Sequence, residues 1–167
     1  MKHPRMLYFF IVLCIFFGSL TSCSNQKETT KDLSVQTEYY YPENWSIDNP
    51  PEKHVEIVQF YHADKCDTCI LLQETLKNLL NTKYRDFSEE GIVIYRGIAT
   101  NYIENLALKQ EFFVMEEDLC GSIFVEGNYF EKDRWVDIFQ TAENNPAQLE
   151  EKIIEKIEAL LEKLSEY

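Results

Sequence analysis

The sequence predicts an α/β domain with a mixed four-stranded sheet and helices on both faces. Apolar, β-branched stretches alternate along the chain with stretches in which leucine or isoleucine recurs every three to four residues. A strand, a helix and a second strand come first, and this order implies parallel pairing through a right-handed crossover. Two later strands joined by a short turn imply an antiparallel hairpin, so the sheet should be mixed.

The first half of the domain is expected to hold two strands and the helix between them. Residues 55–61 are apolar and β-rich, as is typical of a central strand. Residues 70–80 carry leucines at relative positions 0, 4, 7 and 8, which places them on one face of a helix. A polar, turn-forming segment then leads into a second apolar strand at 92–98.

The second half is expected to hold a helix, a hairpin and a final helix. Residues 101–113 predict a helix with four residues facing inward, namely Ile103, Leu106, Ala107 and Phe113. Residues 122–125 predict a strand, and the stretch 129–139 predicts its antiparallel neighbour. Asn145 can cap the last helix, with Pro146 at its first position.

Composition limits the functions open to this chain. Its 167 residues include 16 Lys and Arg against 29 Asp and Glu, a formal charge of −13. Such an acidic chain is not expected to bind nucleic acid, because binding requires a basic surface that displaces counterions from phosphates. The sequence contains neither a P-loop nor a G-x-G-x-x-G motif, and we expect no cofactor.

The beginning of the chain has the features of a secretory signal peptide. A basic start precedes an unbroken apolar run at 6–17, which is too short to span a bilayer as a helix. The stretch Leu20–Cys23 that follows resembles the bacterial lipoprotein box, whose cysteine carries acyl chains such as palmitate. We therefore expect lipidation of Cys23 and tethering to a membrane of the bacterial cell envelope, outside the cytoplasm.

Three regions follow from this interpretation. Residues 1–22 form the signal peptide, residues 23–52 the lipidated N-terminus and linker, and residues 53–167 the folded domain. Within the linker, residues 24–38 are polar and predict a flexible tether. The aromatic residues 39–41 are expected to pack as an arm on the edge of the domain or to dock a partner.

Three thiols remain once the signal peptide and the lipidated cysteine are set aside: Cys66, Cys69 and Cys120. Cys66 and Cys69 are expected on the first turn of a helix, within disulfide distance of each other. Unpaired N–H groups and the macrodipole at a helix N-terminus stabilise a thiolate at Cys66, and only a thiolate is nucleophilic. Cys69, a turn deeper, would resolve a mixed disulfide. Zinc binding and a structural disulfide are the alternatives for this pair.

The strand 55–61, the segment from His62 to Cys69 and the helix that follows resemble the active-site region of the thioredoxin superfamily. With the later Asn144-Asn145-Pro146, this region resembles more closely a family of small bacterial thioredoxin-like proteins known as nitrophenyl compound nitroreductase subunits of the ArsF type. The resemblance spans the element order from 53 to 164. It implies a thioredoxin-like fold, catalysis by Cys66 and Cys69, and a disulfide- or thiol-containing protein partner.

The chain departs from thioredoxins at three places. Asp67-Thr68 replaces Gly-Pro between the cysteines, so a carboxylate opposes the thiolate while Lys65 favours it. Phe60 stands where thioredoxins bury an acid, which leaves Asp64 as a candidate for proton transfer. Gly121 stands where thioredoxins have a cis-proline, and it permits the unusual backbone angles without imposing them.

That alignment places Cys120 near the cysteine pair. Cys120 is then either a buried core residue or a third thiol, which shuttles a disulfide or joins Cys66 and Cys69 in binding copper(I) or arsenite. His62 is a candidate proton donor or modulator of the thiolate. The sequence therefore predicts a membrane-tethered thiol-disulfide oxidoreductase, with a soft-metal binding module or a noncatalytic adaptor of the same fold as alternatives.

Overall fold

The computed structural model describes the backbone of residues 37–40 and the whole of residues 51–167. All of them fall within the unit Ser34–Tyr167. The signal peptide, the lipidation site Cys23 and the tether before residue 37 lie outside the described residues. Within the described part of the chain, no helix combines the length and apolar character needed to cross a bilayer.

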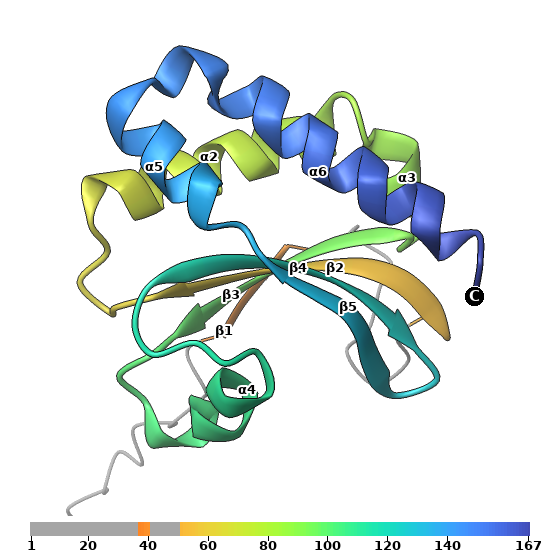
Figure 1. The fold of residues 1–167 in the computed structure, drawn as a ribbon, viewed down its shortest axis with the longest axis horizontal. Coiled ribbons are helices and arrows are strands. Elements are labelled where there is room, and N and C mark those ends of the chain that lie inside the picture. The colour runs from red at the N-terminus through yellow and green to blue at the C-terminus, as the bar shows by residue number, and fades with distance from the viewer. Residues whose placement is uncertain (1–36, 41–50) are drawn as a thin grey trace, which may run out of the picture. The chain divides into compact units, whose positions relative to one another are not determined.

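Five strands form one mixed sheet in the order β1-β3-β2-β4-β5 (Figure 1). Strand β2 is parallel to β3, and every other neighbouring pair is antiparallel. The strands are β1 (Thr37–Tyr40), β2 (Lys53–Tyr61), β3 (Val93–Ala99), β4 (Asp118–Val125) and β5 (Asn128–Arg134). The mixed sheet with its parallel crossover and its hairpin is thus confirmed.

Strand β1 was not predicted, because residues 37 and 38 were assigned to the tether and residues 39 and 40 to the aromatic arm expected on the edge of the domain. It adds to the sheet edge antiparallel to β3, with Thr37 opposite Ile98 and Tyr40 opposite Tyr95. The sheet therefore has five strands rather than four. Part of the predicted linker belongs to the fold.

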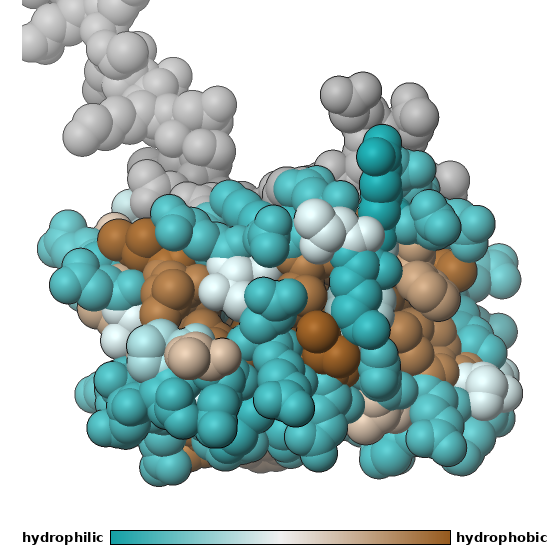
Figure 2. Space-filling view, turned by 90° about the horizontal axis from the view of Figure 1, so that it is seen from above, coloured by the Kyte–Doolittle hydropathy of each residue, from teal (hydrophilic) through white to brown (hydrophobic). Residues whose placement is uncertain are grey.

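Helices cover both faces of the sheet (Figure 1). Helices α2, α5 and α6 lie over one face, whereas the short η1 and α4 lie by the other. The helices are α2 (Asp67–Asn81), α3 (Arg85–Glu89), η1 (Ile103–Asn105), α4 (Leu106–Glu111), α5 (Val136–Asn144), η2 (Pro146–Gln148) and α6 (Leu149–Leu164). Figure 2 shows mostly hydrophilic residues on the outside of the three-helix layer, as expected for amphipathic helices.

The alternation of side chains along β2 creates a separate core on each side of the sheet. Ile57 points into the larger core, together with the predicted leucine face of α2. Val58 and Phe60 point into a smaller core, which Phe112 and Val114 close from the other side. Every residue of β2 after Lys53 is buried, so the strand that leads to the cysteine pair is held on both faces.

The helix predicted over 101–113 is shorter, and its inward face was wrong. All four residues expected to face inward are exposed, and the segment is buried instead through Asn105, Phe112 and Val114. The cause is the 3₁₀ turn that precedes α4, where Asn105 Nδ2 donates to the carbonyl of Ala99 at 2.8 Å. A 3₁₀ helix has three residues per turn, whereas an α-helix has about 3.6. The 3₁₀ turn therefore changes which side chains of the segment face the core.

The stretch 135–139 was predicted as a strand but begins α5. Trp135 and Ile138 are fully buried, and Ala142 is buried four residues later, which is helical rather than strand spacing. Asn145 and Pro146 open the short η2, and α6 begins only at Leu149, without a side-chain cap from Asn145. The final helix thus starts later than predicted.

Gly121 lies within β4, opposite Ile57, and not in the loop before that strand. A Cβ atom at this position would lie 2.3 Å from Cζ2 of Trp135 and 2.6 Å from Cδ1 of Leu160. Glycine is therefore required here by the close approach of Trp135. The expected correspondence with a cis-proline does not hold, and the described residues contain no cis peptide bond.

Candidate active site

The cysteine pair lies beyond the C-terminal ends of the parallel strands β2 and β3. The N–H of Thr100 donates to the carbonyl of Tyr61 at 2.7 Å, so the pairing continues into the loops. The N–H of Ala63 donates to Oδ1 of Asn101 at 3.2 Å and ties the two loops together. These contacts hold the chain that enters α2.

Cys66 is the N-cap residue of α2, and Cys69 lies in its first turn. Sγ of Cys66 accepts a hydrogen bond from the N–H of Cys69 at 3.2 Å, as a capping side chain does. The two Sγ atoms are 2.9 Å apart, and both cysteines are free thiols. The expected placement of the pair on the first helical turn is confirmed, and its sulfurs need only a small approach to form a disulfide.

The two thiols differ in access and in proton affinity. Cys66 is half-buried, whereas Cys69 is fully buried. Burial raises the pKa of the Cys69 thiol strongly, and the hydrogen bond with Cys66 and the negative charges of Cys66 and Glu117 raise that pKa further. Cys69 therefore keeps its proton while Cys66 faces solvent at the helix N-terminus.

Two hydrogen bonds from the sheet, made by Gln59 of β2 and Tyr95 of β3, hold the first turn of α2. Nε2 of Gln59 donates to the carbonyl of Cys69 at 2.9 Å, and the hydroxyl of Tyr95 donates to Oε1 of Gln59 at 2.6 Å. Both side chains are buried, so these bonds are shielded from water. The sequence did not reveal this role, because β2 contains other polar residues, such as His54 and Glu56, and nothing local distinguishes Gln59 from them.

Glu117 is a site residue that the sequence analysis also missed. Its Oε2 lies 3.6 Å from Sγ of Cys66, and its Oε1 accepts a hydrogen bond from the N–H of His62 at 3.4 Å. It precedes β4, whose first residue pairs with Phe60 near the end of β2. No local signal identifies this carboxylate, because the contact depends on the register of β4 against β2.

The structure gives the contacts of the other candidates in the 62–66 loop, His62, Asp64 and Lys65. Nδ1 of His62 accepts from the N–H of Asp64 at 3.4 Å. The carboxylate of Asp64 is exposed, and within the described residues no contact joins it to either sulfur. Nζ of Lys65 donates to Oε1 of Gln73 at 2.8 Å and lies 4.3 Å from the ring centre of Tyr61.

Cys120 is not brought to the pair. It lies opposite Val58 in β4 and belongs to the small core with Phe60 and Phe112, whereas α2 packs on the other face of the sheet. Burial, with a smaller contribution from the charge of Asp118, raises the pKa of the Cys120 thiol to about 12. Cys120 is thus an inert core thiol, and the predicted three-thiol arrangement is not formed.

A different trio of potential ligands is present instead. Among the described residues, one ligating atom each of Cys66, Cys69 and Glu117 lies within 4.8 Å of the others. The trio combines two sulfurs with one carboxylate. Such a set suits zinc better than copper(I), which prefers sulfur throughout.

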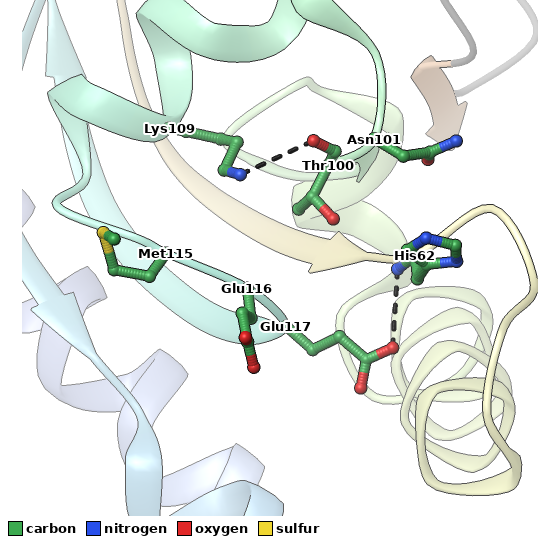
Figure 3. A pocket seen from close by; sticks show the side chains of 7 residues that line it. All are labelled: His62, Thr100, Asn101, Lys109, Met115, Glu116 and Glu117. Carbon is green, nitrogen blue, oxygen red and sulfur yellow. Dashed lines mark hydrogen bonds between the residues drawn. The ribbon is translucent and has the colours of Figure 1, made fainter.

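A pocket of about 530 Å³ opens beside Glu117. In Figure 3, Lys109, Thr100 and Asn101 form one side, Met115, Glu116 and Glu117 form the other, and His62 lies next to Glu117. Because Glu117 is also the carboxylate next to Cys66, the pocket adjoins the more exposed sulfur.

No protein-family model, curated protein or solved structure matches this chain. What the site does must therefore be inferred from its own geometry.

Proposed function

We propose that this protein is a thiol-disulfide oxidoreductase with a thioredoxin-like fold. One observation carries the proposal: a half-buried Cys66 at the N-cap of α2 lies 2.9 Å from a fully buried Cys69. An accessible sulfur at a helix N-terminus with a second thiol behind it is the arrangement that disulfide exchange requires. The order of elements from β2 to α6 supports the fold.

The exchange has two steps. The thiolate of Cys66 attacks a disulfide of the partner, so that a mixed disulfide forms and the partner's other sulfur leaves as a thiolate. Cys69 then gives up its proton and attacks Sγ of Cys66, which forms the intramolecular disulfide and releases the partner's second sulfur. Two electrons pass from the chain to the partner. The reverse sequence oxidises a partner dithiol, and the two reduction potentials determine the direction.

Glu117 is the best-placed acceptor for the proton of Cys69. Because the pKa of Cys69 is raised, the resolving step needs a base close to that sulfur. The carboxylate of Glu117 meets this need, since it lies within 4.8 Å of both sulfurs. This role replaces the one expected for Asp64.

The test is catalysed reduction of insulin disulfides by the full chain, with a dithiol as the electron source. We expect turnover by the wild type, none by Cys66→Ser, and a trapped mixed disulfide with Cys69→Ser. A wild type that adds nothing to the rate of the dithiol alone would disprove the proposal.

The second candidate function is metal binding, favoured by the trio of Cys66, Cys69 and Glu117. A metal-binding module would take up zinc stoichiometrically when reduced and would show no insulin turnover. Equilibrium dialysis of the reduced and the oxidised chain measures this uptake, and insulin turnover by the zinc-free chain distinguishes the two functions, because zinc held by Cys66 and Cys69 would block the sulfurs that exchange. A noncatalytic adaptor is disfavoured by the accessible free thiol of Cys66.

We further propose that the mature chain is attached to a membrane of the cell envelope through lipid on Cys23. The lipoprotein-box sequence supports this, although these residues lie outside the described part. Cys23→Ala should release the chain from the membrane fraction, and mass spectrometry of the wild type should show acyl chains on Cys23. Unmodified Cys23 in membrane-bound protein would contradict it.

A further inference from the structure

The segment between β3 and β4 exposes large apolar side chains on the surface. We call the four of them the α4 surface. Their exposed fractions are 79% for Ile103, 47% for Leu106, 77% for Phe113 and 84% for Met115. Extended apolar patches are uncommon on monomeric proteins and mark interaction sites. The α4 surface therefore has the character of a docking site.

Phe113 adopts a backbone conformation that phenylalanine avoids. Its φ of 56° lies in the left-handed region, where the Cβ atom crowds the carbonyl and where glycine usually ends a helix. The N–H of Val114 donates to the carbonyl of Lys109 at 2.9 Å and holds this turn closed. Phe112 and Val114 are buried on either side, so the turn directs Phe113 outward. This turn is a helix C-terminal cap, and it holds the Phe113 side chain in solvent, where a partner can reach it.

The α4 surface is continuous with the candidate active site. Met115 belongs to it and also lines the pocket beside the cysteine pair (Figure 3). Glu116 and Glu117 continue the same side of that pocket, and Glu117 reaches to 3.6 Å from Sγ of Cys66. A bound molecule can therefore contact the apolar side chains and the reactive sulfur at once.

The charges beside the α4 surface and the adjoining pocket indicate which class of molecule binds there. Within the described residues, neither Glu104, Glu116 nor Glu117 forms an ion pair with a Lys or Arg. The whole chain carries a formal charge of −13. Lys109 also lines the pocket, and its Nζ donates to the carbonyl of Thr100 at 3.5 Å. Because the carboxylates outnumber this cation and the chain is acidic, the net negative potential attracts cationic groups and repels the anionic headgroups of lipids. A basic polypeptide fits better than a membrane or a second copy of this acidic chain.

We propose that the α4 surface and the adjoining pocket bind an extended segment of a partner polypeptide. This segment presents a cysteine to Cys66, a large apolar side chain to Phe113 and Met115, and a Lys or Arg to Glu116. The inference rests on the proposed function, because it assigns a substrate class to the same sulfur.

The test compares two peptide disulfides and one small disulfide as substrates of the full chain. One peptide flanks its cysteine with Lys and Leu, the other with Asp and Ser, and bis(2-hydroxyethyl) disulfide contacts the sulfur alone. We expect a higher kcat/KM for the Lys/Leu peptide. Phe113→Gly and Met115→Ser should each lower it roughly tenfold, as expected for the loss of one apolar contact, with the small disulfide unaffected.

Two controls keep the result interpretable. Phe113→Gly suits the positive φ, so this variant keeps its fold. Phe87→Ser removes an exposed phenylalanine of α3, outside the α4 surface, and should change nothing. Equal kcat/KM values for the two peptides, or equal losses with the small disulfide, would overturn the inference.

Failure of the proposed function gives a different result. A wild type inactive on the small disulfide disproves the exchange chemistry but leaves peptide binding measurable by fluorescence anisotropy with a serine-for-cysteine Lys/Leu peptide. Binding weakened by Phe113→Gly then supports the docking site, and no binding overturns it. Variants that abolish vesicle binding or dimer formation without affecting peptide binding also overturn it.

Discussion

Cys69 and Cys120 are both fully buried thiols whose pKa values are raised by burial, yet only one is placed to react. Cys69 lies behind the half-buried Cys66, with a carboxylate within 4.8 Å. Cys120 lies among Val58, Phe60 and other apolar side chains on the opposite face of the sheet. Burial by itself thus does not define a reactive cysteine. An accessible neighbouring sulfur and a route for the proton do.

The strongest test of this difference replaces one cysteine from each environment. Cys66→Ser should abolish disulfide exchange, because the remaining thiol of Cys69 is inaccessible to a partner. Cys120→Ala should keep the wild-type rate of insulin reduction and lose about 1 kcal/mol of stability through the small cavity it leaves. Urea unfolding monitored by circular dichroism measures that loss. A Cys120→Ala variant without exchange activity would show that the inert assignment is wrong.

The next test concerns the packing of Gly121, the residue that follows Cys120 in β4. Gly121→Ala should cost about 3 kcal/mol or more, because the added methyl group overlaps the ring of Trp135. Gly127→Ala is the matched control, since φ is +86° there and no atom lies within 4 Å, so only backbone strain of about 1 kcal/mol is expected. Thermal unfolding of both variants tests this order, and equal losses would contradict the packing role of Gly121.

A third test addresses the proton of Cys69. Glu117→Gln should slow the resolving step at neutral pH by at least about tenfold, and the deficit should shrink as pH rises and hydroxide replaces the carboxylate. Asp64→Asn removes an exposed carboxylate of the 62–66 loop that contacts neither sulfur, and it should behave as wild type. Stopped-flow decay of a preformed mixed disulfide measures this step. Superimposable pH profiles for wild type and Glu117→Gln would rule out the proposed base.

The last test concerns alkaline stability. The pKa of Cys120 rises from an ordinary value of 9.0 to about 12 in the folded chain. Above pH 9 the unfolded chain loses this proton while the native chain retains it, so stability should fall as pH rises from 9 towards 12. Cys120→Ala should flatten that decline, as measured by denaturant midpoints at each pH. An unchanged slope would show that Cys120 does not contribute.

Local patterns were sufficient where neighbours in sequence are neighbours in space. The spacing of Leu72, Leu76 and Leu79 predicted the buried face of α2, and the cysteine spacing predicted that Cys66 lies at the start of that helix. The same approach failed at 101–113, because one 3₁₀ turn shifted the phase of the helix. It also failed at Trp135, where an aromatic stretch of high β-propensity packs as the start of a helix.

Contacts between distant segments needed the structure. Glu117 is 51 positions from Cys66 in the chain and reaches it only through the register of β4 against β2. That register also determines toward which face of the sheet the side chain of Cys120 points, because side chains alternate along a strand. Starting β4 at Asp118 rather than at Ser122 places Cys120 and Gly121 inside the sheet.

The sequence by itself determined the α/β class, the two thiols at the start of a helix and the acidic character of the chain, since these depend on periodicity, capping and composition. Only the tertiary structure decided which of the three thiols lie together, which carboxylate lies beside them and which apolar side chains are exposed. These outcomes depend on strand register and on how helices lie against the sheet, and both are set by packing between segments far apart in the chain.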